Sequence, residues 1–281
     1  MSPTFGIAFG GGGARGLAHI HVIEALDELG IRPVAIAGSS IGAIMGAGMA
    51  AGMTGRDIHD YARAILGTRA QVASRMWRAR PGTLAEAVQG GLHFTQFNIE
   101  RILKAFLPEA VPARFEELEI PLKVTATDYF GHQLAVFDRG DLHSALAASS
   151  AIPAVFRPVA RDGRMLIDGG IYNPVPFDLI EHDADIIVAI DVVGVPTEAE
   201  RKRPSSVDLM FGATQLMMQS IIANKLKQCR PDILIRPPVS RFRVLDFLKI
   251  DAVMAETVAV KDEVKRAVEA ALAAHYQPQR H

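Results

Sequence analysis

Apolar and polar positions repeat with two different periods along the chain, and the two periods alternate. Short apolar runs bounded by glycine, proline or polar residues predict buried strands. Apolar residues that recur every three or four positions predict helices: Leu17, Ile20 and Ile23 share one helical face, and Gly30 ends that pattern. The predicted strands are residues 5–9, 33–37, 122–127, 133–137, 164–167, 186–192 and 233–235, and the predicted helices are residues 15–29, 41–51, 207–228 and 256–275.

This order of elements predicts an α/β fold. The first strand, helix and strand follow so closely that the two strands are expected to pair in parallel through a crossover. Residues 122–137 predict a hairpin that adds antiparallel pairing at one side of the sheet. We expect a single domain over residues 1–281, a three-layer α/β/α sandwich with a mainly parallel central sheet. Residues 67–94 and 196–206 are the least regular and are expected to be surface excursions, the first of them a candidate lid.

Composition narrows the classes of protein that fit. Hydrophobic residues make up 49% of the chain, which excludes a disordered protein. The 30 Lys and Arg residues nearly balance the 31 Asp and Glu residues, so no nucleic acid partner is expected. The single cysteine, Cys229, cannot form an intramolecular disulfide and fits a reducing compartment. The longest apolar run, residues 41–53, is too short to span a bilayer, and residues 1–5 lack the pattern of a secretory signal. We expect a cytoplasmic protein, with peripheral membrane contact left open.

A glycine-rich turn follows the first predicted strand. Residues 10–16 read Gly-Gly-Gly-Gly-Ala-Arg-Gly, so successive backbone amides can point into one concavity where the first helix starts, which favours an anion. The spacing of Gly11, Gly13 and Gly16 also matches the dinucleotide fingerprint. However, the second predicted strand leads into Gly38 without the acidic residue that would hold a ribose. A tight turn that only lets helix and strand approach is a third interpretation.

A second glycine motif, Gly38-Ser39-Ser40-Ile41-Gly42, stands between the second strand and a helix of small residues. A nucleophile elbow requires small residues two positions before and after its serine, because the sharp turn presses the backbone against neighbouring elements. Only Ser40 has glycine at both positions. Parallel strands bring both glycine motifs to the same edge of the sheet, so Ser40 is the expected nucleophile for an ester carbonyl. The expected oxyanion donors are the amides of Gly11, Gly12, Gly13 and Ile41.

A serine hydroxyl needs a base to act as a nucleophile, and the sequence offers two candidates. His182 stands at what resembles the C-terminus of a helix, where the helix dipole alone favours histidine. Asp168 ends a short apolar strand and is followed by Gly169 and Gly170, which leave room beside its carboxylate. An aspartate at a strand end is also a common cap or turn residue. Of the two candidates, the aspartate stands out.

Taken together, these motifs resemble the patatin-like phospholipase family, and more closely its compact bacterial single-domain members. The likeness rests on residues 11–16, 38–42 and 168–170, and is extended by residues 148–153 and 173–174. It implies a serine hydrolase that cleaves lipid acyl esters, of phospholipase A or lysophospholipase type, with a dyad of Ser40 and Asp168, no catalytic histidine and no cofactor. It carries the oxyanion role to the glycines at 11–13 and gives Arg15 an anchoring role. The supporting motif positions are Gly16, Gly38, Gly42, Gly169 and Gly170.

Two other functions remain open at this point. The first is a histidine-dependent esterase or thioesterase of the α/β-hydrolase type, although that fold places its elbow after several strands and Ser40 follows the second. The second is a binding module that holds a nucleotide or lipid head group without turnover. Histidine and carboxylate spacings match no metal motif such as His-Glu-x-x-His, so no metal site is expected.

The substrate side of the site has weaker signals. Several flexible or aromatic side chains are candidate walls for an acyl chain, although such residues more often fill a core. They are Met45, Met49, Met53, Met210, Phe211, Met217 and Met218. In the candidate lid, Arg75, Trp77 and Arg78 combine positive charge with an aromatic anchor. That combination fits contact with an anionic lipid surface, and a solvated helix face explains it equally well.

Overall fold

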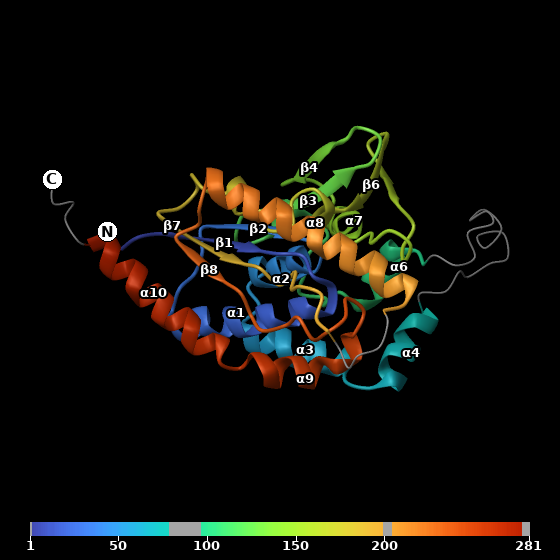
Figure 1. Ribbon diagram of the computed structural model, residues 1–281, viewed down its shortest axis with the longest axis horizontal. Helices are drawn as coiled ribbons and strands as arrows, with labels where there is room; N and C mark the ends of the chain where they lie inside the picture. Colours follow the sequence, from blue (N-terminus) through green and yellow to red (C-terminus); the bar gives the residue numbers. More distant parts are fainter. Residues whose placement is uncertain (1, 79–96, 199–203, 277–281) are drawn as a thin grey trace.

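A computed structural model of the chain describes residues 2–78, 97–198 and 204–276 (Figure 1). The strands are β1 (Phe5–Phe9), β2 (Ala35–Ser39), β3 (Leu122–Asp128), β4 (Gln133–Phe137), β5 (Val159–Arg161), β6 (Arg164–Asp168), β7 (Ile186–Ile190) and β8 (Ile233–Ile235). Within the described residues they form one sheet in the order β5-β6-β3-β2-β1-β7-β8, with β4 also paired to β3. The neighbouring strands β3, β2, β1, β7 and β8 pair in parallel. The strands β4 and β6 pair antiparallel with β3, and β5 pairs antiparallel with β6.

Helices cover both faces of this sheet. They are α1 (His19–Glu28), α2 (Ile41–Ala50), α3 (Gly55–Leu66), α4 (Arg69–Arg78), α6 (Ile99–Phe106), α7 (Leu142–Ser149), α8 (Ser206–Gln228), α9 (Ile250–Thr257) and α10 (Val260–Tyr276). Successive strand residues point to opposite faces. Ile7 and Phe9 of β1 pack in the larger core with α1, α2, α7 and α10, whereas Ala8 packs in the smaller core under α8. In Figure 1, α8 lies above the sheet and α1, α9 and α10 lie below it. The expected three-layer α/β/α sandwich with a mainly parallel sheet is confirmed.

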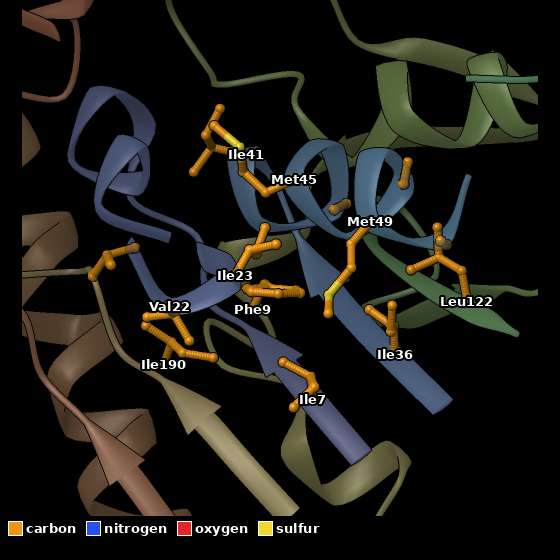
Figure 2. Close-up of a cluster of buried hydrophobic side chains, with 14 of the residues drawn as sticks. Ile7, Phe9, Val22, Ile23, Ile36, Ile41, Met45, Met49, Leu122 and Ile190 are labelled. Atoms are coloured by element: carbon orange, nitrogen blue, oxygen red, sulfur yellow. The ribbon is translucent and has the colours of Figure 1, made fainter. Parts of the chain in front are cut away.

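The larger core fixes the first two helices on the sheet. Figure 2 shows Ile7, Phe9 and Ile36 of the strands in one buried cluster with Ile23 of α1 and Met49 of α2. Burying a side chain of this size contributes roughly 1.5–3 kcal/mol. Because both helices are held along their length, the loops that precede them are held at the carboxyl edge of the parallel strands. These two loops contain the glycine-rich turn and Ser40.

One edge of β3 carries two strands in succession. Residues 122–125 of β3 pair in parallel with β2, ending at Thr125 and Ser39, and residues 126–128 pair antiparallel with β6, starting at Ala126 and Asp168. Since β4 pairs with residues 124–128 of β3, it must occupy the other edge. β2 and β6 therefore point toward each other along β3. Their last residues, Ser39 and Asp168, lie opposite neighbouring residues of that strand.

Three local predictions are corrected. The first helix was expected over residues 15–29, but it begins with a 3-10 turn, Gly13–Ala18. In this turn Gly16 lies so close to the start of α2 that a Cβ on it would come within 2.3 Å of Ile41. Residues 69–78 were expected to be irregular and form α4, because they contain neither proline nor glycine. The helix expected over residues 256–275 begins only at Val260, as α10, and residues 256 and 257 instead end the separate helix α9. Near the break, the Thr257 hydroxyl donates to the carbonyl of Val253, a bond that bends helices.

Other elements were not predicted from the sequence. They are α3, α6, α7, α9 and β5. The hairpin of β3 and β4 was predicted and is confirmed.

Candidate active site

Ser40 occupies a sharp turn between β2 and α2. Its backbone angles, φ 56° and ψ −126°, lie in a region that residues with a side chain rarely adopt. Two glycines allow the close approach that this turn needs: a Cβ at Gly42 would lie 2.2 Å from the carbonyl oxygen of Phe9, and a Cβ at Gly38 would lie 2.5 Å from Cα of Ala43. The turn therefore has the form of the nucleophile elbow that the sequence predicted.

A hydrogen bond from another part of the chain supports this turn. The backbone amide of Ser40 donates to the hydroxyl oxygen of Ser149, at 2.8 Å. Ser149 is the last residue of α7. Ser149 belongs to the motif block of residues 148–153, but its role could not be predicted, because nothing local in the sequence indicates that its hydroxyl faces the elbow. The bond satisfies a buried donor and ties Ser40 to α7.

The side chains of Ser40 and Asp168 are in direct contact. Ser40 Oγ donates to Asp168 Oδ2 at 2.6 Å, and Asp168 Oδ1 accepts from the amide of Gly170 at 2.8 Å. This contact arises because β2 and β6 pair with successive residues of β3, so that their ends lie next to each other. Both residues are buried, with 4% of Ser40 and 7% of Asp168 exposed. The hydroxyl of the neighbouring Ser39 is also buried but has no hydrogen-bond partner in the part of the chain that the structure describes.

Burial changes the acidity of Asp168. It raises the pKa of the carboxyl from 3.8 to about 6, and the hydrogen bonds from Ser40 and Gly170 offset only part of this effect. The Asp168 carboxylate therefore binds a proton more strongly than a solvent-exposed aspartate does. At neutral pH it is still ionised and able to accept one.

The first amides of the glycine-rich turn are used within the fold. The amide of Gly10 donates to the carbonyl of Ile190, and the amide of Gly11 donates to the carbonyl of Pro174, both at 2.9 Å. The Gly11 N–H is therefore not available to an oxyanion, which corrects the expectation for this residue. Gly11 instead determines how closely the turn approaches Ser40, since a Cβ there would lie 3.3 Å from Cβ of Ser40.

The next amides remain as candidate donors. Gly12 and Gly13 line a cavity together with Ser40 and Asp168, and Gly13 has a φ of 60° that suits glycine. The hydrogen bonds within the described residues do not use the amides of Gly12, Gly13 or Ile41. The Ile41 amide belongs to the first turn of α2, where backbone donors have no partner inside the helix. The arrangement offers these three amides to a developing negative charge.

Arg15 holds the glycine-rich turn against later parts of the chain. Its side chain is buried, and its guanidinium donates to the carbonyl of Phe242 at 2.7 Å and to that of Val193. Burial lowers the pKa of Arg15 to about 10, an effect that Asp246 partly offsets. These contacts fit the anchoring role that the family resemblance implied.

Two cavities meet at Ser40. The smaller one, of about 120 Å³, lies beside α8 and includes Gly12, Gly13 and Asp168 in its lining. The larger one, of about 450 Å³, lies between α2, α3 and α6 and is almost wholly apolar. Ser40, Gly13 and Ile152 belong to both linings. The candidate nucleophile thus stands where an apolar chain and a second group can approach from different sides.

Comparison with known proteins assigns the family. The sequence model of the patatin-like phospholipase family matches residues 7–180. This chain belongs to that family. An uncharacterized NTE family protein of Mycobacterium bovis is 38% identical over 194 residues, which cover 69% of this chain and 50% of that protein. A patatin-like phospholipase domain-containing protein of Caenorhabditis elegans is 28% identical, over 89% of this chain and 20% of that protein.

The chain therefore spans about half the length of the Mycobacterium relative that it matches. Among solved structures, VipD from Legionella pneumophila superposes with a TM-score of 0.48 at 15% identity, over 93% of this chain and 67% of that one.

In this patatin-like site the histidine candidate stands apart. His182 lies on the surface with 90% of its side chain exposed, next to the carboxylate of Glu181. His19 is buried, its Nε2 lies 2.8 Å from the carbonyl oxygen of Gly10, and burial lowers its pKa to about 4. No histidine is found among the described residues that line the two cavities. Within these residues, the only base in contact with Ser40 Oγ is Asp168.

The predicted apolar wall residues divide between the cavities, the core and the surface. Met45 and Met53 line the larger cavity, and Met210, Phe211 and Met218 line the smaller one. Met49 belongs to the core, and Met217 is 60% exposed. Five of the seven candidates therefore line one of the two cavities, and their contact with an acyl chain stays a prediction.

The candidate lid of this patatin-like protein is described only as far as residue 78, and the side chains of Trp77 and Arg78 lie outside the description. Arg75 donates to the carbonyl of Ala105 and to the hydroxyl of Tyr61, so it ties α4 to α6 and α3. Membrane contact through this segment stays a prediction. Among the described helices, none has the length and apolar content to cross a bilayer. The described residues also contain no cluster of histidine, cysteine and carboxylate side chains that could hold a metal.

Proposed function

We propose that this chain is a serine hydrolase that cleaves acyl esters of lipids, of the phospholipase A or lysophospholipase type. The observation that carries the proposal is the 2.6 Å hydrogen bond from Ser40 Oγ to Asp168 Oδ2, beside the glycine-rich turn. Membership of the patatin-like phospholipase family supports lipid acyl hydrolysis as the general activity. The apolar cavity that starts at Ser40 supports a substrate with a hydrocarbon chain.

The proposed reaction uses one base for both proton transfers. Asp168 accepts the hydroxyl proton as Ser40 Oγ attacks the ester carbonyl carbon. The bond from that carbon to the alcohol oxygen breaks, and Asp168 passes the proton to the leaving alcohol. Water then attacks the acyl-serine and gives a proton to Asp168. When the bond to Ser40 breaks, the proton returns to the serine oxygen and the fatty acid leaves.

The negative charge that develops on the carbonyl oxygen needs nearby donors. The amides of Gly12 and Gly13, together with that of Ile41, are the proposed oxyanion hole, because they lie around Ser40 and are not used elsewhere in the described chain. A donor of this kind can stabilise the transition state by about 3 kcal/mol. Since these donors are backbone groups fixed by the fold, they need little reorganisation during the reaction.

Covalent labelling tests the nucleophile directly. A fluorophosphonate probe should label the wild type and fail to label Ser40→Ala, while Ser39→Ala, the matched control at the adjacent serine, should be labelled like the wild type. Asp168→Asn should react far more slowly, because no carboxylate accepts the proton. Folded wild-type protein without label, or equal labelling of Ser40→Ala, would overturn the proposal.

The type of ester is tested with defined lipids. Phosphatidylcholine and lysophosphatidylcholine with an isotope in the acyl chain should release labelled free fatty acid in the presence of the wild type, and not in the presence of Ser40→Ala. Release of label from neutral glycerides alone would keep the serine hydrolase and replace the phospholipase assignment.

A further inference from the structure

Three helix faces enclose the larger cavity. Each helix contributes four residues spaced by three, four and seven positions, which is a single face of an α-helix, and α3 adds Leu66 to the lining. These are Ile41, Ile44, Met45 and Gly48 of α2, Ile58, Tyr61, Ala62 and Ile65 of α3, and Ile99, Ile102, Leu103 and Phe106 of α6. Apolar faces of this kind usually pack against each other. Here they surround a space of about 450 Å³.

The chemistry of the walls restricts what can enter. The residues that line this cavity, within the described chain, include no charged side chain. The hydroxyl of Tyr61, one of its few polar groups, is already bonded to the carbonyl of Leu107 and to Arg75. A polar ligand would lose its hydrogen bonds to water in such a space, whereas a hydrocarbon chain gains by leaving water. The occupant that fits these walls is an acyl chain.

The size of the space limits the chain. A methylene group is about as large as a water molecule, which takes about 30 Å³ in the liquid. A cavity of about 450 Å³ therefore has room for roughly 15 such groups. From this comparison, we propose that the cavity takes one acyl chain of about 14 carbons, and that Gly48 limits how long a chain it accepts. The proposal rests on the proposed esterase function of Ser40.

The position of Gly48 gives it this role. It lies two turns along α2 from Ser40, which at about 1.5 Å per residue is about 12 Å. With carbon–carbon bonds of about 1.5 Å at tetrahedral angles, an extended chain reaches that point with about its tenth carbon. A Cβ at Gly48 would lie 3.2 Å from Ile58 Cδ1 and 3.8 Å from the sulfur of Met53, and all three residues line the cavity. The walls formed by α2 and α3 are therefore close together at this point, and a larger side chain at position 48 has to push Ile58 aside, so that the two side chains take up space that the end of the chain needs.

Chain-length profiles test this inference. We would measure kcat/KM for p-nitrophenyl esters with acyl chains of about 4 to 18 carbons, since each methylene that enters an apolar cavity can raise kcat/KM by up to about fourfold. In the wild type, kcat/KM should rise to about 14 carbons and then fall or level off. Gly48→Leu adds four carbons, so the optimum should fall to about 10 carbons. The ratio of kcat/KM for 14 carbons to that for 4 carbons should fall at least thirtyfold, by an order-of-magnitude argument from the same relation.

Two further variants keep the test independent of the folding of Gly48→Leu. Ile58→Ala removes bulk from the opposite wall and should move the optimum to longer chains. Ala64→Leu adds three carbons, one fewer than Gly48→Leu, on the exposed face of α3 and should leave the profile unchanged. A flat profile in the wild type, or unchanged optima in Gly48→Leu and Ile58→Ala, would overturn the inference.

The short ester separates this inference from the proposed function. If the ester of 4 carbons, which does not reach position 48 by the length given above, is hydrolysed by the wild type and not by Ser40→Ala, the proposed function stands whatever the profile shows. If it is not hydrolysed in a Ser40-dependent way, the proposed function fails and the inference fails with it.

Discussion

Replacing Asp168 by asparagine isolates the energetic cost of burying a charge beside Ser40. Burial raises the pKa of this carboxyl from 3.8 to about 6, more than the hydrogen bonds from Ser40 and Gly170 lower it. Asparagine has nearly the same shape. Its carbonyl oxygen can accept from the Gly170 amide, and its amide group can donate to Ser40 Oγ. The variant therefore removes the charge and keeps the packing.

The magnitude follows from the change in pKa. A rise from 3.8 to about 6 corresponds to about 3 kcal/mol of extra cost for ionising Asp168 in the folded state. Between these two values the folded state keeps a proton that the unfolded state releases, so the free energy of unfolding of the wild type falls as the pH rises. Above about pH 6 the free energy of unfolding has fallen by the whole of this amount. Below 3.8 both states are protonated, and this contribution disappears.

Urea unfolding at several pH values measures this effect. The free energy of unfolding of Asp168→Asn minus that of the wild type should grow by up to about 3 kcal/mol between about pH 4 and pH 7.5. Comparing the difference across pH removes any constant effect of the new amide on packing. Asp262→Asn, at an exposed position of α10, is the matched control and should show no such growth.

The pH dependence of kcat/KM tests the raised pKa of Asp168 in a second way. Asp168 must be ionised to accept the Ser40 proton, so kcat/KM of the wild type should rise with pH through a pKa near 6, and Asp168→Asn should be nearly inactive. A stability difference that stays constant or shrinks as the pH rises would refute the reasoning from burial. A wild-type acid limb near 4 would refute it as well.

Three further substitutions test the surroundings of the pair. Gly42→Ala places a Cβ 2.2 Å from the carbonyl oxygen of Phe9, so we expect a loss of about 3 kcal/mol or more in the free energy of unfolding; a melting temperature equal to that of the wild type would contradict the close approach. Ser149→Ala leaves the buried amide of Ser40 without its acceptor, which costs about 1–3 kcal/mol, and kcat should fall more than KM changes. Ser149→Thr keeps the hydroxyl and should restore kcat, and failure of this rescue would argue against the hydrogen bond. His182→Gln should keep kcat/KM within about twofold, since this side chain is 90% exposed, whereas a loss of several orders of magnitude would indicate a histidine-dependent triad.

The elbow and its aspartate were predictable because their requirements are local. Gly38 and Gly42 are needed because the backbone of the elbow lies against other backbone atoms at these positions. A glycine two positions before and after a serine is a pattern that can be recognised in the sequence alone. Asp168 ends an apolar strand and precedes two glycines, which is also a local pattern. Seven of the eight strands and the helices α1, α2, α8 and α10 followed from hydrophobic periods in the same way.

Contacts between distant parts of the chain were not predictable. The carbonyl of Pro174 uses the Gly11 amide, and the hydroxyl of Ser149 supports Ser40, and neither partner is near in sequence. The larger cavity was missed for another reason. The faces of α3 and α6 have the spacing of ordinary core helices, and periodicity does not reveal whether such faces meet or leave a space between them.

The two side chains of the proposed dyad lie on parts of the sheet that differ in how firmly they are held. Ser40 follows a central strand, whereas Asp168 ends β6, which three residue pairs attach to β3 and whose other neighbour is the short strand β5. Local opening of such an outer hairpin requires less free energy than global unfolding. Warming should therefore detach Asp168, the proposed proton acceptor, while Ser40 and the glycine-rich turn stay in place. The protein would then lose turnover at a lower temperature than its core melts, and would recover it on cooling.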